Sequence, residues 1–286
     1  MTGTRPGARL ILTADDFGLS PEVNAAVERA HRDGVLTAAS LMVGERAAPE
    51  AVEVARRNPR LAVGLHLTLA SGTPVLPPGR IPALVGPDGR LRDDMAALGL
   101  ALAASPAARA QLRAEIAAQF AAFRATGLPC DHLNAHRHFH LHPVIAAAAF
   151  RAARDAGVRA VRIPWEPPAL VRAADPTGTA RTQPRALLPL ALLLRRLAAR
   201  LGLRAPDRVV GLAWSGAFTA DRLAAVLPLL PPGTTEAYLH PATAGGFPGG
   251  ARGYDHAGEL AALTDPRVRA AAARLRTGGY AAMLAA

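Results

Sequence analysis

The chain has 286 residues, 50% of them hydrophobic, and carries a formal net charge of +11. This length and apolar content allow a substantial core, and a charged fraction of only 19% argues against wholesale disorder. Its single cysteine, Cys130, can form neither an internal disulfide nor a thiolate metal site, which fits a reducing compartment. All basic residues are arginine and aromatic residues make up 4%, so we do not expect nucleic acid as a partner.

The amino-terminal segment lacks the pattern of a secretion signal. Its apolar run, Leu10-Ile11-Leu12, is shorter than the roughly 7–15 residues of a signal-peptide core, and it leads directly into acidic residues. No stretch approaches the ~20 apolar residues that span a membrane. We therefore expect a cytoplasmic protein, whose basic charge would also allow peripheral contact with the acidic inner face of the membrane.

Apolar runs and helix signals alternate along the chain. Strands are predicted at residues 9–14, 35–43, 61–65, 158–163, 209–212 and 236–239, with a further strand leading into a histidine cluster near 132. Helices are predicted at 21–33 (after a Ser20 cap), 48–57, 93–126, 143–156, 185–203, 221–230 and 265–276. The stretch 71–92 is rich in proline and glycine and is predicted to be a long loop, for which a substrate lid is one role.

This alternation predicts parallel βαβ units in one α/β domain covering residues 1–286, because no composition break or internal repeat divides the chain. A (β/α) barrel is the architecture that we favour at this length, and a doubly wound open sheet is the alternative. In both, functional groups gather in the loops at the carboxyl ends of the strands.

Polar residues follow several predicted strands where each strand ends. Asp15 and Asp16 come after the first strand, His66 after the third and His240 after the last. These strand ends share one rim of a barrel, so the four side chains are expected to share a site. Taken singly, the aspartates would fit a helix cap and His66 a core histidine, but their common position favours function.

The histidine cluster at 132–142 holds five of the nine histidines. If the segment were extended, its even-numbered residues would share one face, but at ~3.3 Å per residue His136 and His142 would lie about 20 Å apart. Metal–nitrogen bonds are roughly 2.0–2.1 Å long, so we expect one ligand, or two, from this segment. The others, including His138 and His140, would orient ligands, contact substrate, cap the next helix or serve only the core.

Two histidines and one carboxylate form a donor set suited to zinc, with iron, manganese, cobalt and nickel as alternatives. Neighbouring residues at a strand end point in different directions, so one aspartate can hold a metal while the other faces a water. Coordination positions left for water predict a catalytic site rather than a structural one.

Four segments together resemble the YdjC (ChbG-type) carbohydrate deacetylase family: TADDFG at 13–18, GLH at 64–66, HRHFH at 136–140 and LHP at 239–241. The resemblance spans almost the whole chain. It implies a distorted (β/α) barrel of the glycoside hydrolase/deacetylase type, in which Asp16, His66 and His136 hold one divalent metal ion, zinc or else magnesium or another ion. It also implies that Asp15 is the general base and that His240 is an acid or supports the ligands.

One departure concerns the substrate. Diacetylchitobiose deacetylases of the family carry an Asp-Ser pair where this chain has Asn134-Ala135. This pair, Arg162-Ile163-Pro164 and the GLAWSG segment at 211–216 are similar to HpnK, the hopanoid-biosynthesis-associated branch. That branch implies an N-acetylglucosaminyl hopanoid as substrate, with a soluble oligosaccharide such as diacetylchitobiose as the alternative. Asn134 and Arg162 are then expected beside the substrate or the catalytic carboxylates.

The predicted helix at 185–203 is leucine-rich and interrupted by arginines. It fits an ordinary barrel helix, and it also fits an interfacial helix that rests on acidic headgroups.

Two rival functions remain: another hydrolase on the same scaffold, cleaving a glycosidic or phosphate ester bond, and a non-catalytic lipid- or sugar-binding accessory protein. The oligomeric state stays open, with a dimer as the assembly considered.

Overall fold

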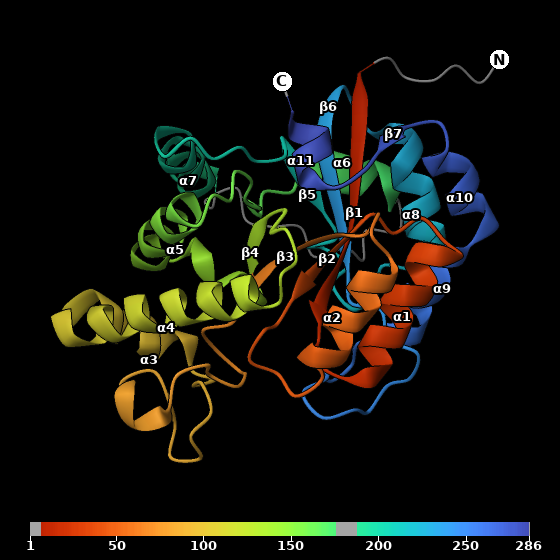
Figure 1. Ribbon diagram of the computed structural model, residues 1–286. Coiled ribbons are helices and arrows are strands. Elements are labelled where there is room, and N and C mark those ends of the chain that lie inside the picture. The colour runs from red at the N-terminus through yellow and green to blue at the C-terminus, as the bar shows by residue number, and fades with distance from the viewer. Residues whose placement is uncertain (1–6, 176–187, 286) are drawn as a thin grey trace.

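The computed structural model describes residues 7–175 and 188–285, and a parallel sheet forms its centre (Figure 1). The strands run in the order β4-β3-β2-β1-β6-β5, and β7 pairs with the start of β1. Their bounds are β1 (Ala8–Phe17), β2 (Ala38–Leu41), β3 (Ala62–Leu67), β4 (Leu133–Ala135), β5 (Arg208–Val210), β6 (Gly233–Leu239) and β7 (Arg276–Thr277). Every pairing is parallel, so the carboxyl ends of the strands lie at the same end of the sheet.

Irregular backbone joins the two edges of this curled sheet. On one side, the amide of Arg162 donates to the carbonyl of Leu133 in β4 (2.9 Å). On the other, the amide of Val161 donates to Arg204 and the amide of Val209 in β5 donates to Trp165, both at 2.9 Å. The fold is therefore the predicted distorted α/β barrel, with one part of its wall built from single bridges instead of a regular strand.

Helices surround the sheet (Figure 1). One group, α3, α4, α5 and α7, lies beside β3 and β4, while α1, α2, α8, α9 and α10 lie on the other side of the molecule. Their bounds are α1 (Pro21–Arg32), α2 (Ala48–Arg57), α3 (Met95–Ala104), α4 (Pro106–Ala125), α5 (Pro143–Asp155), α6 (Pro168–Ala174), α7 (Leu188–Arg200), α8 (Ala220–Val226), α9 (His256–Thr264), α10 (Pro266–Ala272) and α11 (Tyr280–Leu284). The short 3₁₀ helices are η1 (Pro78–Arg80), η2 (His136–Leu141) and η4 (Leu227–Leu229).

The helix α11 packs against the end of the barrel opposite the carboxyl ends of the strands. Its Tyr280 and Met283 form a small buried cluster with Ile11 of β1, Ala38 of β2 and Ala160. The main core fills the rest of the interior. Apolar side chains of α11 thus cover this end of the barrel, and the cavity lined by Asp15, Asp16, His66 and His136 lies at the carboxyl ends of the strands.

Capping residues in the sequence explain where several helices begin and end. The Ser20 hydroxyl accepts a hydrogen bond from the amide of Val23, and Pro21 starts α1, as predicted. The predicted helix at 93–126 is two helices, since Ser105 ends α3 and its hydroxyl caps α4 at the amide of Ala108. No helix in the described part of the chain is both long and apolar enough to cross a membrane.

Several predicted elements differ from the structure. The first strand continues through Asp15 and Asp16 to Phe17, and the predicted strand at 158–163 forms only isolated bridges at Ala160 and Val161. The histidine cluster is not extended beyond Ala135, so the expectation of one shared strand face was wrong. Sequence analysis missed α6, α9 and α11. The start of the predicted helix at 185–203 lies outside the described residues.

Candidate active site

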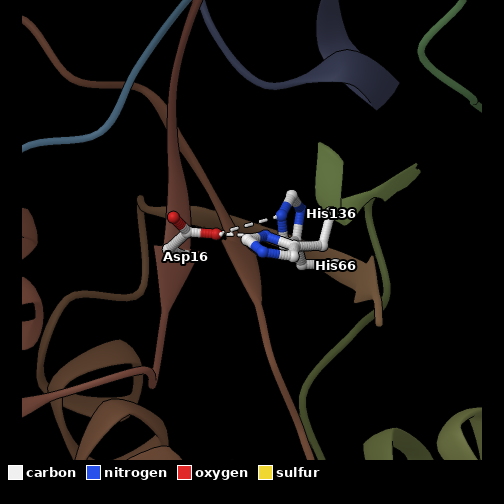
Figure 2. A group of neighbouring side chains, drawn as sticks. All are labelled: Asp16, His66 and His136. Carbon is white, nitrogen blue, oxygen red and sulfur yellow. Dashed lines mark hydrogen bonds and ion pairs between the residues drawn. The ribbon is translucent and has the colours of Figure 1, made fainter. Parts of the chain in front are cut away.

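Asp16, His66 and His136 come together at the carboxyl end of the sheet (Figure 2). The Oδ1 atom of Asp16 lies 3.2 Å from Nε2 of His66 and 2.9 Å from Nδ1 of His136. One ligand atom from each residue falls within 4.8 Å of the other two. β1 and β3 supply Asp16 and His66, and His136 follows β4, so these are three strand ends that the barrel brings onto one rim.

This donor set fits a divalent ion. Asp16 and His66 are buried, and the carboxamide oxygen of Asn134 lies 2.7 Å from Nδ1 of His66. Nδ1–H therefore donates to Asn134, which leaves the lone pair of Nε2 for a metal, the usual arrangement of a metal-ligating histidine. Burial by itself would lower the pKa of His66, but the carboxylates of Asp15 and Asp16 raise it, so the group attracts positive charge.

Strained backbone marks the same place. Among the described residues, the non-glycine residues with positive φ are Asp16 (62°), Ser71 (56°), Arg137 (54°) and His138 (54°). All four line one cavity of about 470 Å³, which also contains Asp15, His66, His136 and His240. Such conformations cost free energy and persist where the surroundings enforce them, as at active sites. At Asp16 the cause is a register irregularity between Ala14 and Phe17 in the β1–β2 pairing.

Asp15, next to Asp16 in the chain, belongs to a buried ion cluster. Both of its oxygens accept hydrogen bonds from the fully buried guanidinium of Arg162, which also donates to Glu236 of β6. Burial alone would raise the pKa of Asp15, but the charge of Arg162 and its hydrogen bonds hold that pKa well below its usual range. Of the two expected roles for Arg162, the structure shows pairing with a carboxylate.

Asn134 connects the two halves of the site. Its carboxamide oxygen faces His66, and its amide nitrogen donates to Oδ1 of Asp15 (2.9 Å) and to the Ser40 hydroxyl (2.8 Å). Ser40 in turn lies 3.0 Å from Nε2 of His132. These contacts fix which end of the Asn134 amide faces His66.

The chain of hydrogen bonds continues to the opposite end of the barrel. Nδ1 of His132 lies 3.1 Å from Asp131, whose carboxylate accepts the amides of Tyr280 and Ala281 at the start of α11. The His132 ring also stacks on Tyr280. The position of Asn134 therefore depends on contacts that span the whole barrel.

The remaining histidines occupy different environments. His240 lines the cavity and its ring lies beside those of Tyr238 and Tyr254. His138 also lines the cavity, with Nε2 3.1 Å from the Tyr238 hydroxyl. His140 is buried outside the cavity lining, and its Nε2–H donates to the carbonyl of Arg162 (2.9 Å).

Sequence reasoning assigned no role in the site to several residues of this region. Tyr238 and Tyr254 line the cavity, as does Ser215 of the segment at 211–216, and the carboxylate of Glu166 accepts the amides of Gly211, Leu212 and Ala213. Desolvation raises the pKa of Glu166 to about 7 although these three amides lower it. The buried ion cluster could have been predicted from Glu236, because it is a charged residue inside a predicted strand that is otherwise apolar. No feature of the sequence indicated the roles of Ser40 and Glu166.

Comparison with known proteins identifies the family. The family model for YdjC-like proteins matches residues 9–274. The chain therefore belongs to the YdjC-like family. A carbohydrate deacetylase of Mus musculus is 33% identical over 93% of this chain and 91% of its own length. A carbohydrate deacetylase of Brevibacillus brevis is 39% identical over 55% of this chain, an alignment that spans only 60% of that relative.

A solved structure agrees on the fold. A protein of Enterococcus faecalis described as a candidate for cellobiose-phosphate cleavage superimposes with a TM-score of 0.76, covering 98% of this chain and all of that one. Only 23% of the aligned residues are identical, so the likeness concerns the fold alone.

We predict that Asn134→Ala lowers the zinc affinity of the metal-free protein by about 10- to 100-fold, because His66 loses the acceptor that orients it. Titration calorimetry with zinc measures this affinity. Ser40→Ala is the matched control, since it removes one contact of the Asn134 amide nitrogen and leaves the Asn134–His66 contact in place. Ser40→Ala should therefore lower the zinc affinity less than Asn134→Ala does. Equal affinities of Asn134→Ala and the parent protein would contradict the assignment.

A second prediction concerns His140, whose pKa is lowered to about 4, mainly by burial. The unfolded chain binds a proton at this residue below about pH 6.5, but the folded chain does so only near pH 4. The free energy of unfolding should therefore fall as the pH drops through this window. Urea titrations of His140→Gln and the parent protein should show a slope smaller by about 1.4 kcal/mol per pH unit in the variant. If the free energy of unfolding of both proteins changed equally with pH, the prediction for His140 would be refuted.

Proposed function

We propose that the protein is a metal-dependent carbohydrate deacetylase that hydrolyses the acetamide of an N-acetylglucosamine-type sugar. The observation that supports this most is the placement of a two-histidine, one-carboxylate group beside Asp15 in a single cavity. Membership of the YdjC-like family and the similarity to carbohydrate deacetylases agree with it. Amide hydrolysis needs an activated water, a proton acceptor and a proton donor, and the cavity offers groups for each role.

In this proposal Asp16, His66 and His136 hold the ion. A divalent ion bound there supplies positive charge that polarises the acetyl carbonyl and makes water more acidic. The surrounding residues support this role, since Asn134 orients His66 and burial shields Asp16 and His66 from bulk water. Zinc is the ion that we favour for this donor set, with magnesium or another divalent ion as the alternative.

Asp15 would accept the proton of the attacking water. Arg162 keeps its carboxylate ionised, which also makes it a weak base, so the transfer depends on a water that is already acidified. The water oxygen bonds to the acetyl carbon, the carbon–nitrogen bond breaks, and the departing amine takes up a proton. His240, on the wall of the same cavity, is the donor that we propose for that step.

The rival hydrolase fits the site less well. A glycosidase of the usual type needs one carboxylic acid with a raised pKa and one carboxylate. Both carboxyl groups of the cavity, Asp15 and Asp16, have lowered pKa values because Arg162 and the two histidines stabilise their charged forms against the opposing effect of burial. The non-catalytic accessory protein predicts sugar binding that survives His66→Ala, without turnover.

For the substrate we propose an N-acetylglucosaminyl hopanoid, on the strength of Asn134-Ala135 and the segments at 162–164 and 211–216. A soluble oligosaccharide such as diacetylchitobiose is the alternative. The structure gives the branch segments local roles: Arg162 carries the buried ion cluster, and Glu166 holds the 211–213 backbone whose Leu212 lines the cavity. A lipid-linked substrate would require a cytoplasmic enzyme to meet the inner membrane face.

We propose that α7 makes that peripheral contact. Ala191, Leu194 and Ala198 are buried, as in an ordinary barrel helix, but Leu192 and Leu193 are 45% and 52% exposed. The exposed side also carries Arg196 and Arg200, which suits acidic headgroups. The helix packs beside η2, which supplies His136, so a membrane bound here would lie near the site.

The catalytic proposal predicts metal-dependent acetate release from an N-acetylglucosaminyl hopanoid, abolished by chelator and restored by zinc. Asp15→Asn should lower kcat by about 100- to 10,000-fold, because the general base is lost. Zinc content and circular dichroism would confirm that the variant is folded and loaded. Asp155→Asn, a change at an exposed carboxylate, is the matched control. Full activity in metal-loaded Asp15→Asn would refute this role of Asp15.

The membrane proposal predicts that the protein floats with liposomes that contain acidic lipid, and less with neutral ones. The double variant Leu192→Ser and Leu193→Ser should lose this binding, because it removes the apolar side chains that would enter the interface. Leu100→Ser, at a leucine of α3 that is 72% exposed, is the control and should bind like the parent. Absence of flotation with either lipid would reject the contact.

A further inference from the structure

A hollow of about 660 Å³ lies at the amino ends of the strands, at the other end of the barrel from the catalytic cavity. Its wall is formed by residues 59–63 at the start of β3, by 128–131 before β4 and by 157 and 159, and Ala281 and Ala282 of α11 complete it. It shares no lining residue with the catalytic cavity. The two spaces are therefore separate.

The side chains that line this hollow are mainly apolar. Leu61, Val63, Leu128 and Pro129 supply the larger ones, and several alanines and the half-buried Cys130 supply the rest. No aromatic side chain belongs to this lining, so a base or a sugar ring finds no surface on which to stack. A concave apolar wall of this size suits an alkyl or acyl chain, which leaves water when it binds there.

Charged groups that lack partners lie on the same wall. Within residues 7–175 and 188–285, the guanidinium groups of Arg60 and Arg159 make no hydrogen bond or ion pair, and both residues are exposed. The third arginine of the lining, Arg56, is already engaged, because it pairs with Glu53 (2.5 Å) and donates to the carbonyl of Thr126 (2.9 Å). Two guanidinium groups are thus available to an anion.

Asp131 is the one acidic residue of the lining. Its carboxylate accepts the amides of Tyr280 and Ala281 and faces His132. Burial alone would raise the pKa of Asp131, but His132 and the two amides lower it, so the group is ionised. It offsets one of the two free positive charges. The remaining single charge complements a carboxylate better than a phosphate monoester, which carries about −1.5 to −2 at pH 7.

We propose that this hollow binds a medium-chain carboxylate, with the acyl chain against the apolar wall and the carboxylate at the free guanidinium groups of Arg60 and Arg159. A planar guanidinium matches the two oxygens of a carboxylate. The site is separate from the metal-ligand group and needs no deacetylase activity, so this inference goes beyond the proposed function and stands or fails independently of it.

The first test compares affinities by titration calorimetry of the zinc-loaded full chain. Octanoate should bind about tenfold or more tightly than butyrate, because its longer chain removes more apolar surface from water. It should also bind about fivefold or more tightly than 1-octanol, which lacks the charge. Arg60→Gln and Arg159→Gln should each lower the affinity for octanoate by about threefold or more and leave that for 1-octanol unchanged. Arg124→Gln, at an exposed arginine outside the lining, is the matched control.

The second test locates the bound ligand through Cys130, the single cysteine of the chain. Burial raises the pKa of this thiol to about 12, so its alkylation by iodoacetamide is slow and is followed by mass spectrometry at pH 9. Saturating octanoate should slow the reaction by about fivefold or more, and butyrate at the same concentration should not. Removal of zinc by chelator should leave the affinity for octanoate unchanged.

Each contrary result overturns the proposal. Equal affinities for octanoate and 1-octanol, or arginine variants that bind octanoate like the parent protein, exclude recognition of the carboxylate. Alkylation that saturating octanoate does not slow, or binding that disappears with the zinc, places the ligand outside this hollow. Octyl phosphate that binds more than about tenfold tighter than octanoate replaces the carboxylate by a phosphate.

Discussion

The guanidinium of Arg162 is the group on which the site depends. It is fully buried between Asp15 and Glu236 and lies over the ring of Tyr238. Removing a charge from water is costly, and such a cluster survives only when every member is paired. Arg162 pairs with the carboxylates of Asp15 and Glu236, while the carboxylate of Asp16 faces His66 and His136. Asp16 and the cluster together hold three carboxylates against one guanidinium, and a divalent cation at Asp16, His66 and His136 would complement this excess of negative charge.

Next to that cluster, a chain of hydrogen bonds runs through the barrel interior from His66 through Asn134 and Ser40 to His132. Asn134 is its central member, because one carboxamide touches His66, Asp15 and Ser40 at the same time. An amide in this position gives His66 an acceptor and Asp15 a donor, which a carboxylate could not do without a proton. The strained backbone at Asp16, Arg137 and His138 is tolerated because these contacts and the surrounding core hold it.

Much of this site could be predicted from local patterns. Asp16 and His66 each stand where an apolar run ends, and His136 follows the strand that was predicted to lead into the histidine cluster. Parallel strands bring such ends together, so the proximity of the three residues followed from the order of elements. The expectation of one ligand, or two, from the histidine cluster agrees with the single histidine, His136, in the metal-ligand group. The expectation of one shared strand face was wrong, because positive φ at Arg137 and His138 turns the chain into η2 instead of continuing a strand. The separate environments of His138 and His140 follow from that turn, and hydrophobic periodicity carries no sign of it.

The sequence by itself determined the alternation of strands and helices, the α/β class and the set of polar residues at strand ends, because these depend on neighbours within a few residues along the chain. The tertiary structure decided how far the barrel departs from regularity, where 159–165 joins its edges, and which carboxylate Arg162 neutralises. It also decided that residues 60, 63, 128, 159 and 282 share one hollow. These features arise from contacts between segments that lie tens to more than a hundred residues apart in the chain, and local patterns do not record the free energies of such contacts.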